Sequence, residues 1–309
     1  MEFTEGLLSA VVRVSVPILL VVLGEIVAER AGVLNIGLEG MMLVGAFAGF
    51  AGALSTDSSV IALALGTACG VGTAALFGAL VLRWALDAIV VGVALNVCAL
   101  GATGVLFRAI AADADTLIVD TLPVLAVPGL STIPIVGPAF FAQNALGYAA
   151  FAGVPLLAWF LARTSPGLSI RAAGENPVAL DALGIDVVRI RWAATLFCGA
   201  AAGAAGVYLS IGYSNTFVEN MTAGRGFVAL ALVVFARWNP WGAAAGVALF
   251  GLATALQVRW QGVSFLGSEI PYQFFQMLPY ALTLVVLAVR PRRGRPAPAA
   301  LAQPYVRER

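Results

Sequence analysis

The chain has 309 residues, of which 61% are hydrophobic and only 11% are charged, and its net charge is +1. A soluble domain carries roughly a quarter charged residues, so the apolar excess predicts lipid-facing surface and excludes an ordinary soluble protein. All 17 basic residues are arginine, and histidine is absent. Because P-loops and Schiff bases need lysine, and the common catalytic triads and many metal sites need histidine, these chemistries are excluded.

The three cysteines, Cys69, Cys98 and Cys198, lie in apolar runs and form no CxxC motif. This pattern is typical of buried free thiols. The N-terminus carries Glu2 and Glu5 where a secretion signal would carry basic residues. We therefore expect the first apolar run to be retained as a membrane span.

A membrane-spanning helix needs about 20 apolar residues, and such segments follow one another along the chain. We predict an all-α, polytopic membrane helix bundle of about eight to ten transmembrane helices, including broken or re-entrant helices. These helices are expected to form one transmembrane domain over residues 1–290. The predicted segments are 7–28, 34–54, 60–82, 88–110, 145–162, 192–211, 227–236 (too short to span comfortably), 242–258 and 271–289.

The second segment, LNIGLEGMMLVGAFAGFAGAL, is unusual at its start. Asn35 and Glu39 interrupt its apolar pattern, and Gly37 and Gly40 weaken it as a helix. Irregular backbone at membrane depth survives only where protein or water covers it. We therefore predict irregular backbone or a broken helix at the start of this segment, covered by protein or by water.

A carboxylate inside a span is expensive and normally faces the bundle interior or water. Two interpretations of Glu39 stay open. In the first, Glu39 and Asn35 line or gate a pathway near the helix break. In the second, Glu39 pairs structurally with Arg13, Arg30 or a backbone end. Asn96, in the middle of its own apolar segment, could contact a ligand, but an interhelical hydrogen bond is favoured.

Arginine placement predicts the orientation, because basic residues favour the cytoplasmic side of a membrane. Six arginines lie from residue 290 onward, and four lie between residues 163 and 191. We expect both regions to be cytoplasmic, and the arginine-free, Pro-rich stretch 111–144 to be a structured loop outside. The tail 291–309 is predicted to be basic, disordered, cytoplasmic and in contact with anionic lipid. The side of the N-terminus stays open.

The longest polar break in the chain runs from Arg163 to Val187, within a predicted cytoplasmic loop over residues 163–191. Pro166 and Gly167, at its start, are expected to end the preceding helix. The break is too long and too regular for a simple turn between two spans. We predict a short amphipathic helix that lies at the membrane surface.

Cap signals limit this helix to residues 177–183. Asn176 and Pro177 are typical of an N-cap followed by proline in the first helical position, and Gly184 is typical of a C-terminal stop. A helix of about two turns is marginal in water alone, so it needs a docking surface. Whether a partner protein or its own bundle provides that surface stays open. The predicted apolar face consists of Ala179, Leu180 and Leu183.

Two strings in the sequence resemble a known family. The first is T-x-x-G-L-x-x-R-A-x-G-x-N-x-x-A followed by Gly-Ile, at Thr164, Gly167, Leu168, Arg171, Ala172, Gly174, Asn176, Ala179, Gly184 and Ile185. It resembles the cytoplasmic coupling loop of ABC-importer permeases for ribose, other simple sugars, nucleosides and branched-chain amino acids. The second, ERAGVLNIGLEGMML at residues 29–43, is similar to the nucleoside and simple-sugar subgroup. The resemblance covers most of the chain.

This resemblance implies a permease subunit of an ATP-driven importer for nucleosides or simple sugars, rather than an enzyme. Alternating access would be coupled to a separate ATPase through the 177–183 helix. ATP and Mg would be bound by that ATPase, so no cofactor and no metal site are expected in this chain, which agrees with the absence of lysine.

The resemblance also implies partners and a location. The partners are ABC ATPase subunits, a second permease subunit in a heterodimer, an extracytoplasmic substrate-binding lipoprotein and membrane lipid, but no nucleic acid. The location is the bacterial cytoplasmic (inner) membrane, with a multi-pass chain and a cytoplasmic C-terminus.

The candidate site residues fall into three groups. The ATPase-coupling residues are Arg171, Gly174, Glu175, Asn176, Pro177, Ala179 and Gly184. The substrate-pathway candidates are Asn35, Glu39 and Asn96. The candidates for an outer gate, which could also meet the binding protein, are Asn215, Glu219 and Arg225.

Other functions are weighed against this one. A permease for branched-chain amino acids uses a related scaffold and stays an alternative. A stand-alone secondary transporter would need an ion site or proton relay, for which Glu39 is the only strong candidate. An intramembrane enzyme is excluded, because the sequence has no histidine, no lysine and no evident pair of intramembrane carboxylates.

Overall fold

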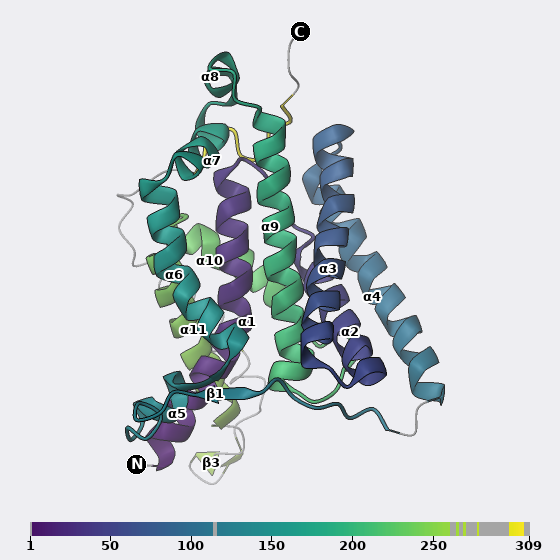
Figure 1. The fold of residues 1–309 in the computed structure, drawn as a ribbon, viewed down its shortest axis with the longest axis vertical. Helices are drawn as coiled ribbons and strands as arrows, with labels where there is room; N and C mark the ends of the chain where they lie inside the picture. The colour runs from purple at the N-terminus through teal and green to yellow at the C-terminus, as the bar shows by residue number, and fades with distance from the viewer. Residues whose placement is uncertain are drawn as a thin grey trace.

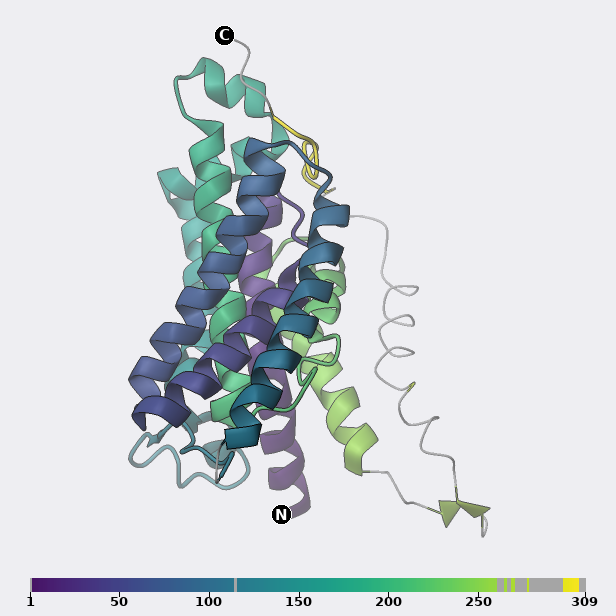
Figure 2. The same ribbon diagram turned by 90° about the vertical axis from the view of Figure 1, so that its right-hand side faces the viewer.

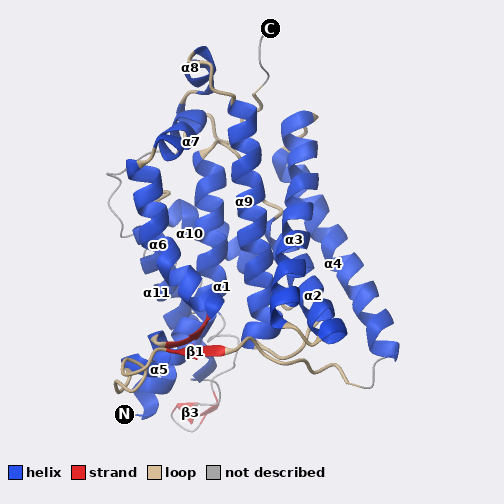
Figure 3. Ribbon diagram, in the orientation of Figure 1, coloured by secondary structure: helices blue, strands red, loops and turns tan. Residues whose placement is uncertain are grey.

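A computed structural model describes residues 2–113, 116–259, 264–265, 268–269, 277 and 297–305, and helices dominate it (Figure 1, Figure 3). The helices are α1 (Glu2–Arg30), α2 (Leu38–Thr56), α3 (Ser59–Gly78), η1 (Ala79–Arg83), α4 (Ala88–Asp113), α5 (Val136–Phe140), α6 (Ala145–Arg163), α7 (Ser165–Glu175), α8 (Pro177–Ala182), α9 (Val187–Val207), η2 (Tyr208–Tyr213), α10 (Arg225–Ala236) and α11 (Pro240–Arg259). Two short antiparallel pairs join β1 (Val124–Ala126) to β2 (Ala142–Asn144) and β3 (Ser264–Phe265) to β4 (Ser268–Glu269).

The prediction of an all-α, multi-pass membrane bundle is confirmed. Seven helices of the described chain are long and apolar enough to cross a membrane, with η1 and η2 continuing α3 and α9, and α10 is a shorter apolar helix. These helices match the predicted segments from 7–28 to 242–258. The last predicted span, 271–289, lies outside the described residues.

The bundle has two distinct ends (Figure 1). Helices α7 and α8 lie at one of them, together with residues 297–305, and we call it the α7–α8 end. The N-terminus lies at the opposite end, beside α5 and β1. Arg259 at the end of α11 also approaches Gly6 there. The structure thus places the N-terminus and the α7–α8 end on opposite sides of the bundle. The predicted structured loop holds β1, α5 and β2.

Glycine lets α2, α3 and α9 approach one another closely. A Cβ added to Gly45 on α2 or to Gly70 on α3 would lie 2.6 Å from the Cα of Gly203 on α9. Because real carbon contacts are longer, only glycine fits at these positions. Small residues commonly bring membrane helices together in this way. The three helices and α1 form the centre of the bundle.

The helical structure is interrupted at two places inside the bundle. The chain leaves α1 at Arg30, runs without regular helix over residues 31–37, and starts α2 at Leu38. It leaves η2 at Tyr213, runs irregularly over residues 214–224, and starts α10. Leu38 is completely buried, and Figure 2 shows that α2 starts between the longer helices. The predicted broken helix is therefore confirmed.

All three cysteines are free, but their environments differ. Cys198 is buried, Cys69 is half-buried and Cys98 on α4 is exposed. The prediction of buried thiols is therefore wrong for Cys98. An apolar run cannot separate the core of a membrane bundle from its outer surface, because lipid tails are as apolar as leucine.

Candidate functional site

The start of α2 is held by two asparagine side chains. Asn35 Oδ1 accepts a hydrogen bond from Gly37 N at 3.0 Å. From α4, Asn96 Oδ1 accepts from Gly40 N at 2.8 Å, while Asn96 Nδ2 donates to Ile36 O at 2.9 Å. The first turn of a helix leaves backbone N–H groups without helical partners, and such groups are costly inside a membrane. The two asparagines supply those partners, so the interhelical role favoured for Asn96 is observed.

Glu39 joins the two breaks in the bundle. Its Oε1 accepts a hydrogen bond from Gly224 N and its Oε2 accepts one from Gly226 N, both at 2.7 Å. These N–H groups lie at the start of α10, where the helix dipole favours a negative charge. A Cβ on Gly226 would lie 2.6 Å from Glu39 N, so the starts of α2 and α10 touch directly. Of the partners proposed for Glu39, the backbone end is the one observed.

The structure therefore brings the three pathway candidates, Asn35, Glu39 and Asn96, to one place. All three side chains bond the irregular backbone around the start of α2 or α10. Their contact with a transported solute stays a prediction. What the geometry adds is that any solute passing here would meet backbone held in place by these side chains.

Two carboxylates that sequence reasoning left without a role also hold this region. Glu25 Oε1 accepts from Asn35 N at 3.0 Å, and Glu25 Oε2 accepts from the Cys198 thiol at 3.2 Å. One turn later, Glu29 Oε2 accepts from the indole N–H of Trp238. Both carboxylates are fully buried.

Sequence reasoning missed that Glu25 and Glu29 are both buried hydrogen-bond acceptors in the bundle. The signal was present in the sequence, because both lie in the last turns of an otherwise apolar span. Their spacing of four residues places them on the same face of a helix. Their partners, however, come from distant segments and could not be read from that spacing.

The polar break from Arg163 to Val187 contains two short helices, α7 and α8, rather than one. Thr164 Oγ1 accepts a hydrogen bond from Gly167 N at 3.1 Å, and Pro166 lies in the first turn of α7. The expectation that Pro166 and Gly167 only end the preceding helix is therefore incomplete. They also lie in the first turn of α7. An N-cap threonine with a proline in the first helical turn is a typical helix start.

The second of these helices, α8, has the predicted caps. Asn176 Oδ1 accepts from Ala179 N at 3.0 Å, Pro177 is in the first turn, and Gly184 has a φ of 81°. The helix ends at Ala182, one residue before the predicted end. The cap signals thus located the helix.

The predicted apolar face of α8 is split by the fold. Leu180 is 4% exposed and packs against Ala173 and Val187. Leu183 is 77% exposed, Val178 is 69% exposed, and Ala179 is exposed as well. The helix α8 lies at the outermost part of the α7–α8 end (Figure 1). The bundle therefore covers one side of α8 and leaves the other uncovered.

The remaining coupling candidates lie on α7. Gly174 packs on the turn after α1, where an added Cβ would lie 3.0 Å from the carbonyl carbon of Arg30 and 3.2 Å from Gly32 N. The carboxylate of Glu175 accepts a hydrogen bond from Ala299 N at 3.4 Å. Arg171 is half-buried on the same helix. The α7 helix thus contacts the transmembrane bundle at the point where α1 ends.

The three outer-gate candidates lie in or next to the segment 214–224 but do not form one cluster. Asn215 O accepts from Val119 N at 2.9 Å. Glu219 forms an ion pair of 3.3 Å with Arg108 on α4. Arg225 donates to Met221 O and Thr222 O and lies near Glu39. Their roles in a gate stay predictions.

Residues 297–305 are ordered at the α7–α8 end, which differs from the disorder predicted for the tail. Their backbone bonds to α7 and to the turn after α1: Ala300 N donates to Gly174 O at 2.8 Å, and Ala302 N donates to Gly32 O at 3.1 Å. We call these residues the C-terminal segment. Composition predicted disorder because it contains no information about partners elsewhere in the fold.

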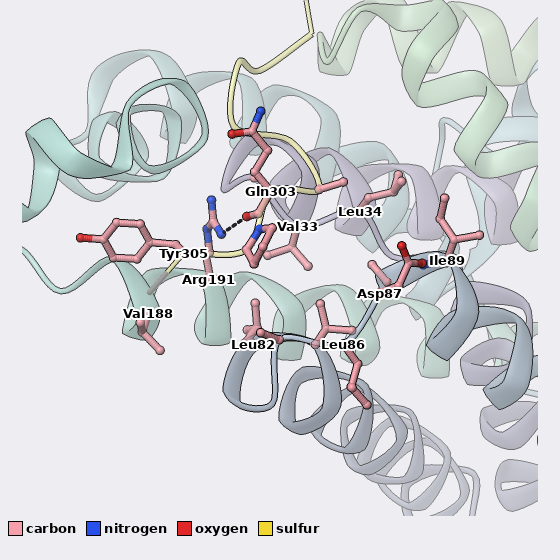
Figure 4. Close-up of a pocket in the computed structure, with 16 residues that line it drawn as sticks. Val33, Leu34, Leu82, Leu86, Asp87, Ile89, Val188, Arg191, Gln303 and Tyr305 are labelled. Carbon is pink, nitrogen blue, oxygen red and sulfur yellow. Dashed lines mark hydrogen bonds between the residues drawn. The ribbon is translucent and has the colours of Figure 1, made fainter. Parts of the chain in front are cut away.

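The C-terminal segment covers one side of a cavity of about 260 Å³ (Figure 4). Its other walls come from the turn after α1, the connection from η1 to α4 and the start of α9. Arg191 of α9 and Tyr305 of the C-terminal segment both line the cavity. Asp87, the N-cap residue of α4, lines it as well. The polar groups in this wall are engaged within the fold.

Comparisons with known proteins agree on one family. A family described as "Branched-chain amino acid transport system / permease component" matches residues 7–287. A Haloferax volcanii protein, whose name describes a glucose ABC transporter permease, is 38% identical over 100% of this chain and 99% of its own length. The nucleoside ABC transporter permease protein NupC of Lactococcus lactis is 36% identical over 89% of both chains. The guanosine ABC transporter permease protein NupQ of Bacillus subtilis is 33% identical over 94% of this chain and 93% of its own length.

These matches confirm the resemblance predicted from the two sequence strings. Together with the seven apolar helices, they identify a multi-pass membrane protein that is a component of a transport system and not an enzyme. The chain belongs to the permease family of ABC transport systems, among relatives named for sugar and nucleoside transport.

Proposed function

We propose that this chain is the permease subunit of an ATP-driven importer for nucleosides or simple sugars. The names of its relatives support the substrate class, since they cite nucleosides, guanosine and glucose. The family description, which cites branched-chain amino acids, supports the alternative substrate. Neutral solutes suit a bundle whose central polar groups are already bonded to backbone.

The observation that carries the coupling role is the uncovered side of α8. Val178 and Leu183 are large apolar side chains on a helix capped at both ends, outside the segments that cross the membrane. Exposed apolar groups on an ordered element favour a protein partner. We propose that a separate ABC ATPase, which binds ATP and Mg, docks here and drives alternating access.

The proposed assembly follows from this role. The α7–α8 end and the C-terminal segment face the cytoplasm, and the N-terminus faces outside, in the cytoplasmic membrane. A second permease subunit completes the pathway as a heterodimer, and a substrate-binding lipoprotein delivers solute at the N-terminal end. The basic tail contacts anionic lipid. The break where α2 and α10 meet lies on the pathway, in the manner of transporters that bind solute at broken helices.

A stand-alone secondary transporter is the weaker alternative. Its candidate ion site was Glu39, yet both carboxylate oxygens of Glu39 accept backbone N–H groups. An anion already satisfied by a helix start is a poor ligand for a coupling cation.

Reconstitution tests the proposed function. The complete complex, with ATPase, second permease and lipoprotein, is placed in liposomes, and uptake of labelled guanosine, glucose and leucine is measured with and without ATP. We expect ATP-dependent uptake of guanosine or glucose and none of leucine. Uptake of leucine alone would replace the substrate assignment, and ATP-independent uptake by this chain alone would overturn the importer.

A further inference from the structure

Arg191, near the start of α9, is buried where three parts of the chain meet. Its Nε donates to Ala31 O at 3.1 Å, in the turn after α1. Its Nη1 donates to Gln303 O at 2.8 Å, as Figure 4 shows, and its Nη2 donates to Ala300 O at 3.5 Å. A buried arginine normally pairs with a carboxylate. Within the described residues Arg191 forms no salt bridge and bonds neutral carbonyl groups instead.

The planar guanidinium explains how one side chain joins these parts. Its donors project in fixed directions, so it can bond several carbonyl groups at once, whereas lysine offers a single point charge. The space is also limited, because a Cβ on Gly32 would lie 2.7 Å from Arg191 Nη2. Gly32 has a φ of 91°, a conformation that favours glycine. Arginine and glycine therefore fit this junction together.

The C-terminal segment also contacts α7 and packs against the small cluster through which α7, α8 and α9 meet. It bonds α7 through Gly174 O and the Glu175 carboxylate. Tyr305 packs with the small apolar cluster that holds Leu180 of α8. The same segment bonds Gly32 O, in the irregular stretch between α1 and α2. One short stretch thus links α7, α8, α9 and the turn that leads to the break.

We propose that Arg191 and the C-terminal segment, residues 297–305, hold the coupling helices to the turn after α1, so that movement of α7 and α8 is passed to the α1–α2 break. Arg191 is a positioning residue in this role and touches no solute. The proposal rests on the proposed function, because it needs an ATPase at α8. The proposal adds a second element to the coupling loop, namely a contact made by a segment that lies far from that loop in the sequence.

The first experiment removes the connection in the full complex reconstituted in liposomes. One variant ends the chain after Pro296 and another is Arg191→Gln. Uptake of guanosine or glucose, whichever the wild type takes up, is measured beside ATP hydrolysis. We expect hydrolysis to remain while solute moved per ATP falls by about tenfold, a typical coupling between sites. Arg191→Lys should restore only part of the ratio.

Arg189→Gln is the matched control. Arg189 lies two residues away on α9, its side chain is 88% exposed, and it pairs locally with Asp186. The Arg189→Gln substitution removes the same charge without touching the C-terminal segment. The amount of solute moved per ATP should therefore stay at the wild-type value. An unchanged ratio in both the truncated chain and Arg191→Gln would overturn the proposal. If the wild type itself shows no ATP-dependent uptake, the proposed function has failed rather than this inference.

A second experiment does not depend on the truncated chain folding. Glu175→Cys and Ala299→Cys are combined with Cys98→Ser, and a disulfide is formed between α7 and the C-terminal segment. If the two move together, oxidation leaves the solute-to-ATP ratio of this variant equal to the ratio of the same variant in its reduced form, so the loss of the Glu175 carboxylate itself does not enter the comparison. Loss of uptake on oxidation that reduction restores would show that the segment must leave α7, and would overturn the proposal.

Discussion

The break at the start of α2 and the α7–α8 end differ in what they leave without a partner. The polar side chains at the break are bonded within the chain, whereas apolar side chains at the α7–α8 end stay exposed. At the break, Asn35, Glu39 and Asn96 all bond backbone groups within the chain. At the α7–α8 end the helix caps are satisfied internally, yet Val178 and Leu183 remain exposed. The first region is complete within one chain, whereas the second leaves apolar side chains uncovered at the site where we propose that a partner docks. Substitutions at the first should therefore cost stability, and substitutions at the second should cost assembly.

Glu39→Ala should have the largest effect. It leaves Gly224 N and Gly226 N without acceptors in a buried site. Hydrogen bonds to a charged group contribute about 1.5 to 3 kcal/mol each, so we expect a loss of about 3 kcal/mol or more in the free energy of unfolding. Thermal unfolding of the purified chain in detergent measures it. An unfolding temperature equal to the wild type would show that the break does not depend on Glu39.

The double substitution Val178→Asp and Leu183→Asp should have the next largest effect. It should lower the affinity for the ATPase and leave the stability of the chain unchanged. An apolar contact at the centre of an interface contributes about 2 kcal/mol, so affinity for the ATPase should fall by roughly 30-fold or more. Unfolding should change little, because exposed substitutions usually have small effects. Pull-down of the ATPase with purified chain measures the first and thermal unfolding the second. Unaltered ATPase binding would remove α8 from the interface.

Gly174→Ala sharpens the comparison because it lies between the two regions. The new methyl group would meet the backbone of Arg30 and Gly32 and displace α7 from the turn after α1. We expect uptake per ATP hydrolysed to fall by about tenfold. Gly72→Ala on α3 is the control, since a Cβ there would touch nothing within 4 Å. Equal behaviour of the two variants would show that the α7 contact carries no coupling.

Glu219→Gln should have the smallest effect on stability. The ion pair with Arg108 is exposed, with side chains 46% and 69% accessible, so it should contribute less than about 1 kcal/mol. Thermal unfolding should be unchanged and uptake should be measured beside it. A change in uptake at constant stability would support a role of Glu219 in the outer gate, and unchanged uptake would remove it from that role.

Local signals in the sequence were sufficient for several features. The N-cap Asn176, the proline after it and Gly184 located α8, because caps act over only a few residues. Asn35 and Glu39 in an apolar run located the break in α2. Glu25 and Glu29 were visible as charges, but their partners Cys198 and Trp238 lie far along the chain. Such contacts follow from packing and have no local signature.

By itself the sequence determined that this is an apolar helical membrane protein with a capped polar loop, a broken span and no lysine or histidine chemistry. These properties depend on composition and on residues close together in the chain. Only the tertiary structure decided that Glu39 holds the start of α10, that the polar loop contains two helices of which α7 packs against the turn after α1, and that Arg191 joins this turn to residues 297–305. Each of these requires two distant backbone segments to meet, and the close approach of helices sets which segments meet.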